Sequence, residues 1–255
     1  MGNLYYCFEE DYVKSALAKS KKSDLAVIDT DGIPASTIKA AAGRGVYVYG
    51  YINVGALEDG RSYYQKFKYL RLAKYDGWDG EYWIDPTAQD WKDHIAELGK
   101  KIKATGAIGV YFDNSDIYYM VRHLKKQYSR SIPTRTSVYK ALRDMVRELN
   151  DIGLIVMPNG GDDFVRTFFA AEWDAVKYIP TINQEGLLYE DFKAQSSSER
   201  KYRTAYVDWA KKQGCYIRGI EYCKKPAEIA KCKAYYKLHG WQGLYISKHK
   251  DLRGD

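Results

Sequence analysis

Eight short apolar runs recur along the chain with helical segments between them, and this alternation constrains the fold more than any other feature. Apolar and β-branched runs that alternate with helical segments are typical of parallel βα units. The expected strands are Leu4–Phe8, Leu25–Asp29, Val46–Ile52, Ile108–Asp113, Leu154–Pro158, Ala175–Ile182, Cys215–Tyr222 and Gly243–Ser247. Eight such units predict an α/β fold, a single (β/α)₈ TIM barrel, for which roughly 250 residues is a typical length. Residues 1–255 are therefore expected to form one domain.

Helical segments between the runs carry start and stop signals. Pro34 and Pro226 suit a first helical turn, and glycines such as Gly43 and Gly240 follow a last turn. The helices are expected at Pro34–Ala42, Gln89–Ala104, Ser137–Asn150, Glu199–Gln213 and Pro226–Leu238. The aromatic-rich segment Asp76–Pro86 is an additional piece between the third strand and its helix.

An open, doubly wound sheet is the structural alternative to the barrel. Such a sheet normally carries a glycine-rich phosphate turn directly after a strand. The glycines of Gly43-Arg44-Gly45 instead precede a strand. The pattern therefore favours the barrel.

The formal net charge of +7 raises the question of nucleic-acid binding. The basic residues are spread over the expected outer helix faces, and no segment interleaves them with aromatic residues as a nucleic-acid surface would. Apolar runs such as Leu154–Pro158 are far shorter than the roughly 18 residues that a membrane helix needs. We expect no nucleic-acid partner, no membrane span and a monomer.

The first residues, Met1 to Tyr6, show no charged region followed by an apolar one, as a secretory leader would. A cytoplasmic protein and a secreted protein whose leader has been removed both explain this. The four cysteines are too few for a disulfide scaffold, and we expect buried free thiols: Cys7, Cys215, Cys223 and Cys232. A Cys223–Cys232 bridge remains open if the protein is secreted.

Polar residues follow nearly every expected strand, where an eight-fold barrel builds its active site. Those with acidic or amide side chains are Glu9, Glu10, Asp29, Asp31, Asn53, Glu58, Asp113, Asn114, Asp116, Asn159, Glu185 and Glu221. Tyrosines lie among them, namely Tyr51, Tyr111, Tyr118, Tyr189 and Tyr222. A polar cleft with aromatic walls suits sugars, whose hydroxyls need hydrogen-bond partners and whose C–H faces stack on rings.

Asp113 and Glu185 are the candidate catalytic pair. Glycoside hydrolysis needs one carboxyl group to protonate the leaving oxygen and another to act as nucleophile or base. Asp113 ends a strongly apolar strand, where a carboxylate has no packing role, and Glu185 follows the sixth strand. The alternative is that either one caps a loop. Because the two strand ends are separated by one strand, we expect carboxyls about 5 to 6 Å apart and a retaining mechanism, with Asp113 as nucleophile and Glu185 as general acid and then base.

The other residues at the strand ends are expected to bind the substrate: Asp29, Tyr51, Asn53, Asp116, Asn159, Tyr189, Glu221 and Tyr222. Asp116 also competes for the role of Asp113 or could N-cap the following turn. Glu221 is ambiguous, and Asp31 before Gly32 is an ordinary turn signal.

Metal and cofactor chemistry find little support in the sequence. The four histidines, His94, His123, His239 and His249, are scattered and follow no expected strand, which argues against a zinc site or a histidine triad. A calcium site at Asp113, Asp116 and Asp162 lacks the loop spacing of a calcium loop. We expect no metal and no cofactor.

Five motifs in order resemble the endo-α-1,4-polygalactosaminidase family of glycoside hydrolases. They are Tyr51-Ile52-Asn53-Val54-Gly55 with Glu58 and Arg61, then Glu81-Tyr82-Trp83-Ile84-Asp85, Gly109-Val110-Tyr111-Phe112-Asp113-Asn114-Ser115-Asp116, Pro158-Asn159-Gly160 and Gln184-Glu185-Gly186-Leu187-Leu188-Tyr189. The resemblance covers roughly residues 24–247. It implies a barrel, a galactosamine-containing α-linked polysaccharide as substrate, no metal, a location outside the cell or on its surface, and catalytic carboxylates at Asp113 and Glu185. Ala56-Leu57 and the insert Gln127–Thr136 depart from the family pattern, which bears on substrate specificity.

Two hypotheses of different classes follow. The first is an endo-acting glycoside hydrolase, and the second is a catalytically silent carbohydrate-binding barrel that kept the cleft. The presence of both Asp113 and Glu185 favours the enzyme.

Overall fold

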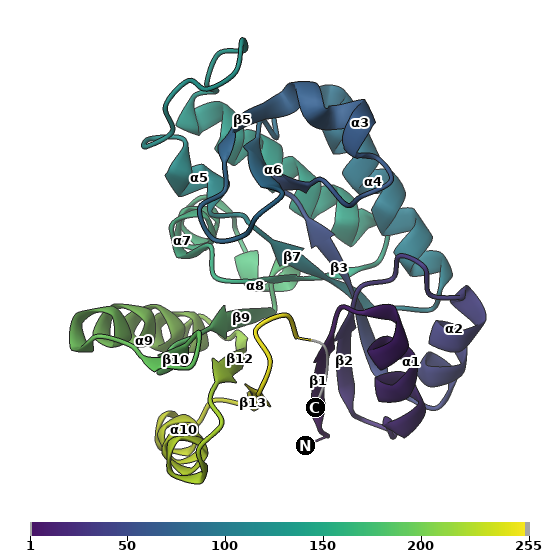
Figure 1. Ribbon diagram of the computed structural model, residues 1–255, viewed down its shortest axis with the longest axis vertical. Helices are drawn as coiled ribbons and strands as arrows, with labels where there is room; N and C mark the ends of the chain where they lie inside the picture. The colour runs from purple at the N-terminus through teal and green to yellow at the C-terminus, as the bar shows by residue number, and fades with distance from the viewer. Residues whose placement is uncertain (1, 253–255) are drawn as a thin grey trace.

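Parallel strands follow one another around the molecule in the order in which they occur along the chain (Figure 1). The computed structural model describes residues 2–252. One sheet has the order β1-β2-β3-β7-β8, and a second has β9-β12-β13. The strands are β1 (Leu4–Cys7), β2 (Leu25–Ile28), β3 (Tyr47–Asn53), β7 (Gly109–Asp113), β8 (Ile155–Pro158), β9 (Thr181–Glu185), β12 (Tyr216–Tyr222) and β13 (Gly243–Ser247). A single parallel bridge between Asn159 and Asn183 continues the first sheet into the second.

The first and last strands approach each other at the remaining seam. The rings of Tyr6 on β1 and Tyr245 on β13 lie 5.3 Å apart between centroids, and the Phe8 amide donates to the Leu252 carbonyl at 3.2 Å. No ladder of strand hydrogen bonds joins β13 to β1 within residues 2–252. The predicted fold class is confirmed as an α/β fold of the barrel type with this open seam.

Amphipathic helices cover the outside of the strands. The longer ones are α1 (Glu10–Lys19), α2 (Ala35–Gly43), α4 (Gln89–Ala104), α6 (Arg135–Asp151), α7 (Asp162–Ala171), α9 (Ser197–Lys212) and α10 (Pro226–His239). Single turns occur at α3 (Tyr64–Phe67), η1 (Lys68–Leu70), α5 (Ile117–Met120) and α8 (Ala175–Tyr178). In α4 the buried residues Trp91, Ile95 and Ile102 recur at helical spacing and form the stripe that packs inward.

The prediction of a strand over Ala175–Ile182 is wrong. Its apolar first half forms helix α8, and the strand β9 begins only at Thr181, after Pro180. A short apolar run fits a helix as well as a strand, so periodicity could not separate them. The strand extends instead through Asn183 and Gln184 to Glu185, which makes Glu185 the last residue of β9.

The connection from β3 to α4 forms a small antiparallel sheet of its own. Its strands β4 (Ala56–Glu58), β5 (Arg71–Lys74) and β6 (Glu81–Ile84) pair in the order β4-β6-β5. The sequence predicted only the segment Asp76–Pro86 as an additional piece. This insertion is attached to the barrel mouth because Glu81 accepts hydrogen bonds from Asn53 at the end of β3 and from Asn114 after β7.

The inside of the barrel is rich in tyrosine. Tyr6, Tyr49 and Tyr111 pack there with Met157 and Ile220, and all five are buried. Buried hydroxyls need partners, and that of Tyr6 donates to the Asn183 side chain at 2.8 Å. Asn183, a polar residue of β9, therefore serves the tyrosine core inside the barrel.

All four cysteines are buried free thiols, as expected. The Cys223 and Cys232 sulfurs lie 3.9 Å apart without a bond between them. No helix within residues 2–252 combines the length and apolarity that crossing a membrane requires.

Candidate active site

The carboxyl ends of the strands open into a cavity of about 1070 Å³ with a strongly acidic wall. Fourteen carboxylate side chains line it, against the three cationic side chains of Arg61, Arg203 and Lys250. The acidic residues are Glu10, Asp29, Asp31, Glu58, Asp59, Asp79, Glu81, Asp113, Asp116, Asp162, Glu185, Glu190, Glu199 and Asp251. This excess of negative charge favours a cationic ligand.

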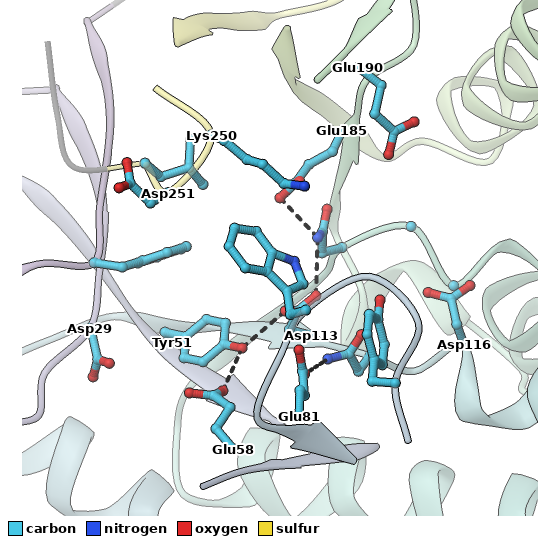
Figure 2. Close-up of a pocket in the computed structure, with 18 of the residues that line it drawn as sticks. Asp29, Tyr51, Glu58, Glu81, Asp113, Asp116, Glu185, Glu190, Lys250 and Asp251 are labelled. Atoms are coloured by element: carbon cyan, nitrogen blue, oxygen red, sulfur yellow. Dashed lines mark hydrogen bonds between the residues drawn. The ribbon is translucent and has the colours of Figure 1, made fainter. Parts of the chain in front are cut away.

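Asp113 and Glu185 face each other in the middle of this cavity (Figure 2). The Asn159 amide nitrogen donates to Asp113 Oδ1 at 3.0 Å and to Glu185 Oε1 at 3.1 Å. These two oxygens therefore lie no farther apart than the sum of the two distances, about 6.1 Å. Strands β7 and β9 supply the carboxyls, and Asn159, directly after β8 between them, fixes their spacing.

Two tyrosines hold Glu185 from inside the barrel. The Tyr111 hydroxyl donates to Oε1 at 2.8 Å, and the Tyr222 hydroxyl donates to Oε2 at 3.0 Å. The Tyr111 oxygen also accepts from Asn183 at 3.0 Å, which fixes the direction of its own proton. Glu185 is thus oriented by donors to both of its oxygens.

A chain of hydrogen bonds supports Asp113 from the other side. The Tyr51 hydroxyl lies 3.1 Å from Asp113 Oδ2 and 3.0 Å from Glu58 Oε1. Glu58 Oε2 accepts from Arg61 Nε at 2.7 Å, and Arg61 also bonds to Asp29 at 2.6 Å. Since a hydroxyl carries one proton, Tyr51 can donate to only one of its two carboxylates at a time.

The two central carboxyls have raised pKa values. Burial, followed by the negative charge of Asp113, raises the pKa of Glu185 to about 7. Burial also raises the pKa of Asp113, against the hydrogen bonds from Asn159, the Asn114 backbone and Tyr51. A buried carboxyl with a raised pKa next to a second, hydrogen-bonded carboxylate is the arrangement of a general acid beside a nucleophile.

Glu81 is a third carboxyl of this group, and it comes from the insertion. Its Oε1 accepts from Asn53 and from Asn114, each at 2.8 Å, and burial raises its pKa to about 8. Asn53 was predicted to bind substrate, but it lies behind the cavity wall, where its amide positions Glu81 and Glu58. The insertion covers Asn53, and nothing in the sequence of β3 indicates this.

The structure places neither Glu221 nor Tyr189, both predicted to bind substrate, at the cavity wall. Ile220 and Tyr222 pack inside the barrel, so Glu221 between them points the other way, as strand alternation requires. There it accepts from the amides of Leu188 and Tyr189 at 2.9 and 2.8 Å and from Tyr236 of α10. Its role is to hold the loop that follows Glu185.

The remaining predicted residues do line the cavity: Asp29, Tyr51, Asp116, Asn159 and Tyr222. Asp116 begins the turn α5 but makes no side-chain cap bond. Burial and the nearby charge of Asp162 raise its pKa to about 7. No group of three or more His, Cys, Asp or Glu side chains in the described part of the chain is arranged to hold a metal ion.

Several lining residues lie outside the strand ends at which site residues were predicted. Tyr75, Trp78 and Glu81 come from the insertion, whose aromatic and acidic residues were visible only as an extra segment or a motif. Glu190, Tyr202 and Lys250 lie outside the ends of the barrel strands. No local pattern marks them, since only the fold brings them to the mouth.

Replacing Asn159 by Ala is expected to lower kcat by on the order of 100-fold, the typical effect of removing a fixed donor in an active site. The variant loses the one amide that touches both carboxyls, so their spacing relaxes. Steady-state kinetics together with a thermal melt check this, and Gln65→Ala on the exposed side of α3 serves as control. Wild-type kcat in a folded Asn159→Ala protein would contradict the bridging role.

The sequence model of glycoside-hydrolase family GH114 matches residues 4–237. An uncharacterized protein of Thermotoga maritima is 21% identical over 199 residues, which cover 72% of this chain and 58% of that protein. The chain thus spans a little more than half the length of this curated relative.

Solved structures share the fold at low sequence identity. The glycoside hydrolase domain of PelA from Pseudomonas aeruginosa has a TM-score of 0.76 at 14% identity, with 99% of this chain and 97% of that chain covered. Aspergillus fumigatus Ega3, solved in complex with galactosamine, has a TM-score of 0.73 at 15% identity, with 98% and 92% covered. An α-galactosidase from Thermus thermophilus has a TM-score of 0.57 at 11% identity, with 95% and 57% covered.

Proposed function

The chain belongs to glycoside-hydrolase family GH114, and from this membership we propose that it is an endo-acting glycoside hydrolase that cleaves α-1,4 linkages in a galactosamine-containing polysaccharide. The observation that carries the proposal is the pair Asp113 and Glu185, held by one Asn159 amide in the middle of a large open cavity. We also propose that the chain acts as one monomeric catalytic domain, without a cofactor, outside the cell or on its surface.

The charge of the cavity supports an amino sugar as the unit that is recognised. Fourteen acidic against three basic lining residues leave a large negative excess. A neutral polysaccharide gains little binding energy from an acidic wall. A polymer with free amino groups is a polycation near neutral pH and is attracted to it. Tyr51, Tyr75, Trp78 and Tyr222 add the aromatic surface on which sugar faces stack.

The spacing of the two carboxyls supports a retaining mechanism. Their facing oxygens lie within about 6.1 Å of each other, which allows the short carboxyl separation of roughly 5 to 5.5 Å that retaining enzymes use. In the first step Glu185 gives its proton to the leaving glycosidic oxygen while Asp113 attacks the anomeric carbon and forms a glycosyl ester. In the second step Glu185 takes a proton from water, which attacks the same carbon and releases Asp113.

The proposal is tested with a reducing-sugar assay on a galactosamine-rich polysaccharide. Polyglucosamine and a neutral galactan are the controls. Products of several sugar lengths early in the reaction would indicate endo cleavage. Binding of the polymer without release of reducing ends would instead indicate a silent carbohydrate-binding barrel.

The stereochemistry of the first product gives an independent prediction. Proton NMR of a running digest is expected to show the α-anomer first, since two displacements at one carbon restore its configuration. The β-anomer then appears only by mutarotation. If the β-anomer came first, Asp113 would be the base that activates water.

A further inference from the structure

Three segments that are distant in the sequence meet over the cavity through Trp78, Lys250 and Asp191, here called the rim bridge. The Lys250 ammonium lies 4.9 Å from the centre of the Trp78 ring and 3.0 Å from Asp191 Oδ2. Trp78 belongs to the β5–β6 loop, Asp191 to the turn between β10 (Tyr189–Glu190) and β11 (Lys193–Ala194), and Lys250 follows β13. Trp78 and Lys250 both line the cavity, so the bridge is part of its mouth.

The Asp191 end of the bridge is connected to the catalytic pair through its neighbour Phe192. Asp191 and Phe192 have φ angles of 48° and 62°, a left-handed conformation that non-glycine residues rarely adopt. The ring of Phe192 lies edge-on to Tyr222 with 6.2 Å between centroids, and Tyr222 in turn donates to Glu185. The turn is therefore tied to the general-acid side of the site. In Figure 2, Lys250 lies on the same side of the pocket as Glu185 and Glu190, opposite Glu58 and Glu81.

In the rim bridge, the ammonium group of Lys250 contacts the Asp191 carboxylate and the face of the Trp78 ring. A protonated amino sugar presents the same group, with three N–H donors, next to a C–H face that can stack on a ring. Trp78 is nearly half exposed, at 47%, which leaves room for a second ligand beside it. The site thus fits the chemistry of the polymer unit as well as that of lysine.

We propose that Lys250 is the built-in occupant of a cation subsite, and that the Trp78 ring and the Asp191 carboxylate receive an ammonium group of the polysaccharide once Lys250 swings away. This inference rests on the proposed function for the identity of the polymer. It adds a rim subsite at which the enzyme's own side chain competes with substrate.

Lys250 is suited to leave. About half of its side chain is exposed, at 46%, as is that of Asp191, at 50%, so the ion pair is screened by water and contributes little. Trp78 and Lys250 line the same cavity as the catalytic pair, so a polymer bound there can meet the bridge. Displacement of Lys250 would then free Trp78 and Asp191 to contact the polymer.

The test measures whether substrate displaces Lys250. NMR of the chain with labelled lysine is expected to show the Lys250 ε-methylene shifted by the Trp78 ring current, and the Trp78→Ala variant identifies that signal. Titration of the inactive Asp113→Asn chain with de-N-acetylated α-1,4-galactosamine oligomers should remove the shift. Persistence of the shift at saturation would overturn the proposal.

Calorimetry of the same oligomers gives the energetic counterpart. Lys250→Met, which keeps chain length and removes the competing charge, should tighten Kd about fivefold, a gain of the size expected for one exposed cation–π contact and ion pair. That gain should vanish when Trp78→Ala is also present and with fully N-acetylated oligomers, which carry no ammonium. The exposed Lys212→Met is the matched control and should leave Kd unchanged. If Lys250→Met still tightened Kd in the Trp78→Ala background, the loss of positive charge alone would explain the effect and the subsite would be refuted.

The outcomes separate the two proposals. Displacement of Lys250 without cleavage by the unsubstituted chain would refute the hydrolase and keep the subsite. Cleavage with Lys250 still on Trp78 would refute the subsite and keep the hydrolase. Oligomers that neither bind nor are cleaved would refute both.

Discussion

Asp113→Asn and Glu185→Gln are each expected to lower kcat by about a thousand-fold or more while the fold is retained. Each substitution keeps the shape and most hydrogen bonds of the side chain and removes one chemical role. An amide at position 113 cannot form the glycosyl ester, and an amide at position 185 cannot give a proton to the leaving oxygen.

The two variants should differ on an activated substrate. An aryl glycoside has a leaving group that needs little protonation, so Glu185→Gln should keep its first step and accumulate the intermediate. Asp113→Asn should stay inactive on both substrates. Glu97→Gln, an exposed carboxylate on α4, is the control for charge loss alone. Near-normal activity of either central variant, with a normal melting temperature, would remove that residue from the mechanism.

The pH dependence of kcat/KM is expected to be a bell whose alkaline side begins near pH 7. Glu185 must be protonated at the start of the reaction, and its pKa of about 7 means that the competent form is lost as pH rises through that value. Asp113 must be ionised, and its raised pKa moves the acid side of the bell to a higher pH than that of an exposed aspartate. Above the bell, activity should fall about tenfold per pH unit.

Tyr222→Phe should move the alkaline side upward. The Tyr222 hydroxyl stabilises the charged form of Glu185 and so lowers its pKa. Without this hydroxyl the pKa of Glu185 rises, and Glu185 stays protonated to a higher pH. Tyr216→Phe, at the exposed start of the same strand, should leave the profile unchanged. Because burial raises the pKa of Glu81 to about 8, Glu81→Gln is measured as well. An alkaline side that disappears in Glu81→Gln would assign the titration to Glu81 instead of Glu185.

The barrel strands could be predicted from the sequence because buried parallel strands are almost uniformly apolar. β2 (Leu25–Ile28), for example, is buried at every position and reads directly as a strand. β9 could not be read in this way, since Asn183 and Gln184 are buried polar residues, and the partners of Asn183 are Tyr6 on β1 and Tyr111 on β7. Such partners become visible only when the fold has brought them together.

The central site was predictable to the extent that it lies at strand ends. Asp113 and Glu185 end their strands, and the structure places them together. Glu221 also lies near a strand end, but strand alternation turns its side chain outward. Trp78 and Lys250 approach the cavity from loops, whose paths no periodicity describes.

The cavity is lined by acidic residues, whereas the rest of the molecule carries a net positive charge. The formal net charge is +7 and the lining residues contribute fourteen negative and three positive charges, so the remainder of the chain carries a formal excess of 18 positive charges. A polycation that approaches this molecule is repelled by the net positive charge of the rest of the chain and attracted by the acidic cavity. It should therefore meet the cavity more often than an uncharged polymer would. Since the screening length shrinks from about 10 Å at 0.1 M salt to about 3 Å at 1 M, this preference should fade at high ionic strength, and slower capture of long chains would result.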